Sequence, residues 1–226
     1  MSASRAFFNR NITLVGGLLL ILSGVAIVGL GISVYRVYVR ARSSAHLRSS
    51  IPRLCEEAVR QRQVLDSAIE SYKRSLGCYP PDHVLPQAPP GVDAITNQLL
   101  YELLGTTYDP VKDTFYPIGF PKIKGADAKR FFNTTHFKNS TEDRQTVGHF
   151  LNESDTGGTI DIQERPDTVA LLTFWPSWQG VDPELYQQIE IGTWCYNSSA
   201  PTHKPNAYDL WIEIKTPLTN IVIANW

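Results

Sequence analysis

Histidine, cysteine and carboxylate side chains could supply acid–base, nucleophilic or metal chemistry, but here they are scattered. No His-Glu-x-x-His pair, paired Cys-x-x-Cys, P-loop, Gly-x-Ser-x-Gly or dinucleotide-binding glycine pattern is present. We expect the isolated histidines to be surface or loop residues: His46, His83, His136, His149 and His203. Four aspartates are the remaining, minor candidates for a metal: Asp109, Asp113, Asp155 and Asp161. The sequence therefore predicts no catalytic, cofactor-binding or metal-binding residues, and no enzyme.

The three cysteines leave two alternatives open. Cys55 and Cys78 lie at opposite ends of a predicted helix, too far apart for a disulfide. Cys78 and Cys195 could be bonded in an oxidising compartment, or all three could be free thiols.

Two other patterns bear on binding. Asn-x-Ser/Thr sequences would mark glycosylated surface loops in a secreted eukaryotic domain and mean little in a bacterium; they begin at Asn11, Asn133, Asn139, Asn152 and Asn197. The tryptophans gather in the C-terminal quarter, where we expect sheet core, with a sugar- or partner-binding face as the alternative: Trp175, Trp178, Trp194, Trp211 and Trp226. With 21 Lys+Arg against 22 Asp+Glu and no basic patch, nucleic acid is excluded as a partner.

The longest apolar run lies near the N-terminus. No charged residue occurs between Arg10 and Arg36, and about 20 apolar residues span a bilayer as a helix. The run is longer than the core of a cleaved signal peptide and has no polar face, so we favour a retained membrane anchor over a signal peptide or a buried soluble helix. We predict a short cytoplasmic leader over 1–11, a transmembrane helix over 12–35 and a joint over 36–50. Counted alone, the arginines on either side mildly favour a cytoplasmic C-terminal side.

A second, amphipathic helix is predicted over 51–76. Gly77 would end it, and Pro80-Pro81 would prevent its continuation. Its apolar residues recur every three or four positions, with Arg62 interrupting the stripe: Ile51, Leu54, Cys55, Ala58, Leu65, Ala68, Ile69, Tyr72 and Leu76.

The rest of the chain divides into a region without periodicity and a region with the alternation of strands. We predict a variable loop region over 82–165, with a short helix over 94–104 and some short elements hidden in it. Residues 168–226 alternate apolar and polar positions, which predicts strands over 168–175, 188–195, 207–214 and 219–224, the last two as a hairpin. The expected fold class is α+β, with the long N-terminal helix packed on a C-terminal antiparallel sheet.

Two segments resemble a known family. A membrane helix leading into an amphipathic helix that ends in Tyr72-x4-Gly77-x-Tyr79-Pro80-Pro81-Asp82 resembles the type IV pilin-like proteins, and among them the major pseudopilin of type II secretion systems. The stretch Asn206–Trp211 with Asn225-Trp226 is similar to the end of large bacterial pilin-like sequences. The resemblance covers the two ends, about half of the chain.

The resemblance implies a membrane-anchored structural subunit of a secretion or pilus machine. Its partners would be the lipid bilayer, other pilin-like subunits through the N-terminal helix, and the assembly platform. The chain would be single-pass in the inner membrane, with residues 51–226 as a pilin-like domain on the periplasmic side. Thr13 and Leu14 match the prepilin signature, but Asn11, Ile12 and Gly16 stand where it has Gly, Phe and Glu, which implies an uncleaved, divergent subunit. The alternative is a single-pass membrane glycoprotein with a small ligand-binding ectodomain.

Overall fold

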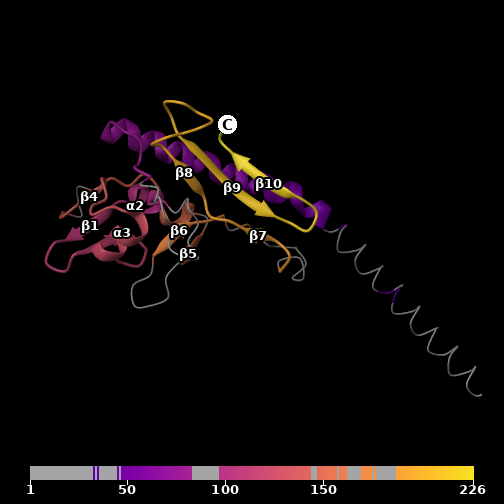
Figure 1. The fold of residues 1–226 in the computed structure, drawn as a ribbon, viewed down its shortest axis with the longest axis horizontal. Coiled ribbons are helices and arrows are strands. Elements are labelled where there is room, and N and C mark those ends of the chain that lie inside the picture. The colour runs from indigo at the N-terminus through magenta and orange to yellow at the C-terminus, as the bar shows by residue number, and fades with distance from the viewer. Residues whose placement is uncertain are drawn as a thin grey trace, which may run out of the picture. The chain divides into compact units, whose positions relative to one another are not determined.

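A computed structural model describes residues 33, 35, 45, 47–82, 97–143, 147–156, 158–161, 169–174, 176 and 187–226 (Figure 1). The chain divides into two compact units, Met1–Ser49 and Ser50–Trp226. The predicted membrane span over 12–35 lies outside the described residues except for Ser33 and Tyr35, which are helical. In the part of the chain that the structure describes, we find no helix with the length and hydropathy to cross a membrane.

One long helix, over 47–76, confirms the predicted amphipathic helix; we call it the stem helix. Residues 47–50, expected in the joint, are already helical. The helix ends where the sequence predicts, because Gly77 adopts φ +77° and its N–H donates to the Lys73 carbonyl at 2.8 Å. That left-handed conformation closes a helix and favours glycine.

The stem helix buries one face. Its buried side chains recur every three or four residues, as one side of a helix requires: Leu54, Ala58, Gln61, Leu65, Ala68, Ile69 and Tyr72. The apolar members belong to the same core cluster as Leu210, Ile212 and Ile214 of the C-terminal strands. Figure 1 shows the helix running along the β9–β10 hairpin. The α+β class is therefore confirmed, with the helix packed lengthwise on this sheet.

The C-terminal sheet has the order β10-β9-β7, and β8 also pairs with β9. All its pairings are antiparallel, and the predicted hairpin is present. The single strand expected over 188–195 was wrong: Gly192 to Trp194 interrupt it, and Thr193 bridges to Thr173 instead. The strands are β7 (Glu190–Ile191), β8 (Cys195–Asn197), β9 (Asp209–Lys215) and β10 (Asn220–Ala224).

The strand expected over 168–175 joins a different sheet. Only β6 (Ala170–Leu172) forms there among the described residues, and it pairs antiparallel with β5 (Thr159–Asp161). β5 falls inside the segment predicted to be loop.

The loop predicted over 82–165 is the largest error of the sequence analysis. A four-stranded sheet, which we call the first sheet, forms there in the order β3-β2-β1-β4, antiparallel except for the parallel β1–β4 pair. Its strands are two to four residues long, too short for alternation to be recognised. They are β1 (Thr106–Asp109), β2 (Thr114–Pro117), β3 (Ile123–Lys124) and β4 (Ser140–Thr141).

Three short helical segments complete the described part of the chain. α2 (Leu99–Leu104) lies within the predicted helix over 94–104, whose first three residues are outside the described part. Gly105 ends α2 at φ +74°, and a Cβ there would collide with Val147. α3 (Gly125–Phe132) and the 3-10 helix η1 (Glu153–Asp155) were not predicted.

Candidate functional site

Gln61 is the polar centre of the seam between the stem helix and the sheets. It is 8% exposed; its side-chain carbonyl accepts from the Trp194 indole N–H at 3.0 Å, and its amide donates to the Thr156 and Thr173 carbonyls. The backbone carbonyl of Trp194 in turn accepts from the Asn97 side-chain amide at 2.9 Å. An unpaired donor in this place would carry a full desolvation cost, so the network fixes how the helix lies on its neighbours.

The stem helix also reaches the C-terminal hairpin. Arg62, which interrupts the apolar stripe, donates to the Ala224 carbonyl at 2.7 Å, and Tyr208 donates its hydroxyl to Asp66 at 2.8 Å. Burial and then the charge of Asp66 raise the pKa of Tyr208, so the phenol is protonated and serves as the donor. Arg62, which interrupts the apolar stripe, thus links the stem helix to the C-terminal hairpin.

The segment after the stem helix is held by the strand β8 and the residues that follow it. The Pro80 carbonyl accepts from the hydroxyls of Tyr196 at 3.0 Å and Ser198 at 2.8 Å. Asp82 is 3% exposed and accepts from the backbone N–H groups of Ser198 and Ser199 at 2.8 and 2.9 Å.

Aromatic rings extend this junction. The Tyr79 and Tyr208 ring centroids lie 5.1 Å apart and those of Tyr196 and Tyr208 lie 5.7 Å apart, while the Lys73 ammonium lies 4.0 Å from the Tyr79 centroid. Tyr79 comes from one segment that carries the family resemblance and Tyr208 from the other. The structure therefore brings these two distant segments into one cluster.

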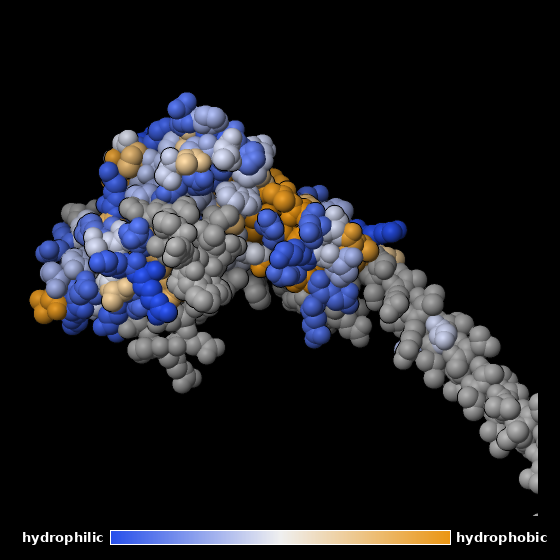
Figure 2. All heavy atoms as spheres, viewed as in Figure 1, coloured by the Kyte–Doolittle hydropathy of each residue, from blue (hydrophilic) through white to orange (hydrophobic). Residues whose placement is uncertain are grey.

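Some apolar residues of the stem helix remain partly or fully accessible. Ile51, Cys55 and Val59 are half-buried, and Val64 is 40% exposed. Figure 2 shows hydrophobic surface where the stem helix and the C-terminal hairpin lie, whereas most of the remaining visible surface is hydrophilic. Cys55 and Val59 also pack against the core cluster, so among the described residues of this helix Val64 is the large apolar side chain left exposed for other contacts.

The structure does not gather the metal candidates. Asp109 ends β1 and pairs with Lys112 at 2.9 Å, and Asp113 lies in the following turn and accepts from the Tyr108 hydroxyl at 3.1 Å. Asp155 lies apart in η1, and the side chain of Asp161 is outside the described set. Among the residues described, no group of three or more His, Cys, Asp or Glu side chains could hold a metal.

The histidines that the structure describes do not come together. His136 packs on the Tyr108 ring, and His149 contacts the Leu104 carbonyl at 3.1 Å. His203 contacts Asp209 at 3.2 Å. Positions 46 and 83 lie outside the described residues.

The cysteine alternatives are resolved in favour of thiols. None of Cys55, Cys78 and Cys195 is disulfide-bonded. Cys195 is 8% exposed and points its sulfur at the Thr193 carbonyl.

The Asn-x-Ser/Thr positions differ in accessibility. Asn139 is 4% exposed and donates to the Glu102 and Gly148 carbonyls at 2.7 Å each, so the folded chain leaves no room for a glycan there. Asn197 binds Ala200 through both its amide N–H and its carbonyl oxygen. Asn133 and Asn152 are exposed, and Asn11 lies outside the described residues.

Of the three tryptophans that are described, only Trp194 lies in the core where we expected them. Trp194 is 1% exposed, Trp211 is half-buried and Trp226 is 46% exposed. The Trp226 ring stacks on His203 with centroids 3.9 Å apart and meets the Trp211 ring edge to face at 5.7 Å. Positions 175 and 178 lie outside the described residues.

Glu102 is a buried carboxylate that the sequence analysis missed. It is fully buried and accepts from the Tyr72 hydroxyl at 2.8 Å, from Gln98 at 2.7 Å and from the backbone N–H groups of Lys138 and Asn139 at 2.9 Å. It joins α2, the stem helix and the segment before β4. A glutamate within the apolar run of α2 was the available signal, since charged residues are almost never fully buried without partners.

Comparison of the chain with family models, with curated proteins and with solved structures finds no match.

Proposed function

We propose that this chain is a membrane-anchored, pseudopilin-like structural subunit of a type II secretion or type IV pilus-like assembly. The predicted transmembrane helix over 12–35 would hold it in the inner membrane with the domain over 51–226 on the periplasmic side, and packing would be its mechanism. The observation that carries the proposal is the contact between the two segments that resemble the family. Tyr79, Pro80 and Asp82, which follow the stem helix, contact Tyr208, Tyr196 of β8 and Ser198, respectively.

The stem helix supports the same proposal by what it leaves uncovered. A subunit that assembles through this helix needs one face committed to its own sheet and another available for neighbouring helices. Leu54, Leu65 and Ile69 supply the first, and Val64, which is 40% exposed, belongs to the second. The burial of Asn139 counts against glycosylation at that position and so gives the glycoprotein alternative less support.

Cross-linking in the membranes of the producing cell tests the proposal. A cysteine placed at Val64, with Cys55 and Cys78 replaced by serine, should give a ladder of multiples of 25.3 kDa with a bismaleimide. The matched control is a cysteine at Val111, which is 94% exposed in the β1–β2 turn and should give only monomer. A monomer band for both variants would contradict assembly through the stem helix, and a mobility shift with endoglycosidase would favour the glycoprotein.

A further inference from the structure

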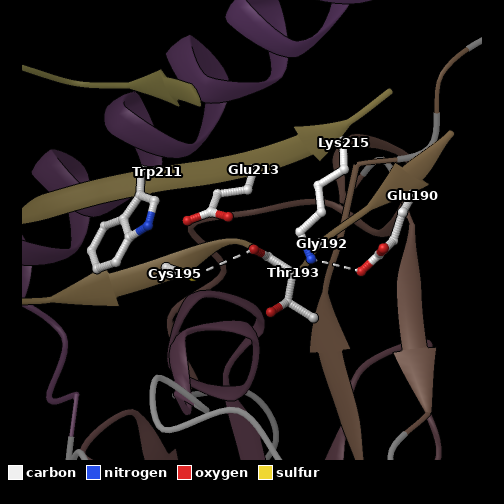
Figure 3. A pocket seen from close by; sticks show the side chains of 7 residues that line it. All are labelled: Glu190, Gly192, Thr193, Cys195, Trp211, Glu213 and Lys215. Atoms are coloured by element: carbon white, nitrogen blue, oxygen red, sulfur yellow. Dashed lines mark hydrogen bonds and ion pairs between the residues drawn. The ribbon is translucent and has the colours of Figure 1, made fainter. Parts of the chain in front are cut away.

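A hollow of about 240 Å³ lies on the outer face of the C-terminal sheet (Figure 3). Along β9 the buried residues Leu210, Ile212 and Ile214 alternate with Trp211, Glu213 and Lys215, which therefore point away from the core. We call this hollow the Trp211 groove. It lies on the opposite face of β9 from the residues that join the core with the stem helix.

Gly192 opens the groove beside Glu213. Its N–H donates to the Glu213 carbonyl at 2.9 Å, and a Cβ at this position would stand 3.2 Å from the same oxygen. A Cβ at Gly192 would therefore make a tight contact, which the backbone of β9 could accept only by moving a few tenths of an ångström. Because its φ is not in the left-handed region, this close approach is what favours glycine here.

The charged groups of the groove and the Trp211 indole N–H are either paired with each other or free of a partner among the described residues. Lys215 pairs with Glu190 at 2.9 Å across the sheet. The Glu213 carboxylate and the Trp211 indole N–H make no hydrogen bond or ion pair with the residues that the structure describes. Figure 3 shows the Trp211 and Glu213 side chains as neighbours on β9, with Lys215 turned toward Glu190.

An indole face next to an uncompensated carboxylate is complementary to a cation. Arginine fits best, because its planar guanidinium stacks on an aromatic ring and donates two parallel hydrogen bonds to a carboxylate. The groove is smaller than the ~300–1,000 Å³ of small-molecule pockets, so it suits one side chain. A saccharide would need several uncommitted hydrogen-bonding groups, and the Lys215–Glu190 pair is committed.

We propose that the Trp211 groove receives an arginine side chain of a partner protein, with the guanidinium stacked on the Trp211 indole and hydrogen-bonded to the Glu213 carboxylate. This inference goes beyond the proposed function, since the groove uses neither the apolar run nor the stem helix. The cross-linking of Val64 and the binding of arginine at Glu213 can therefore succeed or fail separately.

Nuclear magnetic resonance of the indole N–H groups tests the proposal on the purified full chain. Substitution of Trp211→Phe assigns the Trp211 peak, and the probe is Nα-acetyl-arginine methylamide. We expect a saturable shift of the Trp211 peak that weakens as salt is added, and none with the citrulline analogue, which has the same shape without the charge.

Two substitutions separate the site from general charge effects. Glu213→Gln should weaken arginine binding at least tenfold, and Glu142→Gln, which removes an exposed carboxylate of the first sheet's edge, should leave it unchanged. Thermal melting verifies that both variants fold. An unmoved Trp211 peak, an equal shift with citrulline, or unchanged binding in Glu213→Gln would overturn the proposal. A shift with cellobiose in place of arginine would overturn it in favour of a sugar site.

Discussion

The C-terminal sheet is fixed to the stem helix by directed hydrogen bonds, whereas the first sheet is packed by aromatic rings. The side-chain oxygens of Gln61 and Asp66 accept hydrogen bonds from Trp194 and Tyr208, respectively. Phe137, which lies between α3 and β4 beside the first sheet, is surrounded by rings with centroids 4.8 to 6.2 Å away: Tyr101 of α2, Phe115 of β2 and Phe132 of α3. Directed contacts fix the register of one element on another, while rings mainly contribute buried area.

The largest expected effect comes from emptying the aromatic cluster. Phe137→Ala should cost about 3–5 kcal/mol in the free energy of unfolding, because a fully buried ring is replaced by a cavity. Urea denaturation measures the loss. Val111→Ala, at an exposed position in the same sheet's turn, should change stability by less than about 0.5 kcal/mol. If Phe137→Ala lowered the free energy of unfolding by less than about 1 kcal/mol, the aromatic rings would not be the main source of stability beside this sheet.

The stability of the chain should depend on the hydrogen bonds that Gln61 makes between the stem helix and the sheets. Gln61→Leu should cost about 1–3 kcal/mol, because the buried Trp194 N–H loses its acceptor. The exposed neighbour Gln63→Leu is the matched control and should be nearly neutral. Equal stability of both variants in urea would contradict a specific role for Gln61.

The Tyr208 hydroxyl provides a smaller test of the hydrogen bonds between the stem helix and the C-terminal part of the chain. Tyr208→Phe should cost about 1 kcal/mol, the net value of its hydrogen bond to Asp66. Tyr116→Phe, on the more exposed Tyr116 of the first sheet, should have no measurable effect on the midpoint of unfolding. If the two changes had the same effect, the Tyr208–Asp66 contact would contribute nothing.

The smallest effect should appear in the pH dependence of stability. Burial alone would raise the pKa of Asp209, but the backbone N–H groups of His203, Thr202 and Lys204 hold it below its ordinary value of 3.8. The ionised carboxylate thus stabilises the folded chain above about pH 4, and this contribution is lost as the pH falls through the lowered pKa.

Asp209→Asn tests this dependence. The variant should be less stable than the native chain by less than about 1 kcal/mol at pH 7, and the difference should shrink below pH 4. Thermal melts from pH 7 to pH 3 measure it. A difference that stays constant down to pH 3 would contradict the stabilising role of the ionised form.

The stem helix and the C-terminal hairpin could be predicted because their patterns are long. Apolar positions from Leu54 to Tyr72 repeat over five turns of helix, and β9 alternates through seven residues. Gly77 marks the end of the helix because only a left-handed conformation closes it there.

The first sheet and the polar contacts could not be predicted, for two physical reasons. Strands as short as β3 and β4 contain too few residues to show a period, and their pairing depends on contacts distant in sequence. Gln61 looks like an ordinary surface residue in the sequence, because its burial depends on partners that only the fold supplies, such as Trp194. Glu102 stands within an apolar run, but the partners that allow its burial, such as the Asn139 amide, also come only from the fold. For the Trp211 groove, the sequence indicated only that some tryptophans could form a binding face.

Hydrogen–deuterium exchange of the full chain tests most directly whether the stem helix and the C-terminal sheet form one cooperative unit. Peptides from 54–76 and 209–215 should exchange at one common slow rate, and Gln61→Leu should accelerate both equally while the first sheet changes less. Fast exchange of the helix beside a protected sheet, or acceleration of the helix alone, would contradict the packing on which this account depends.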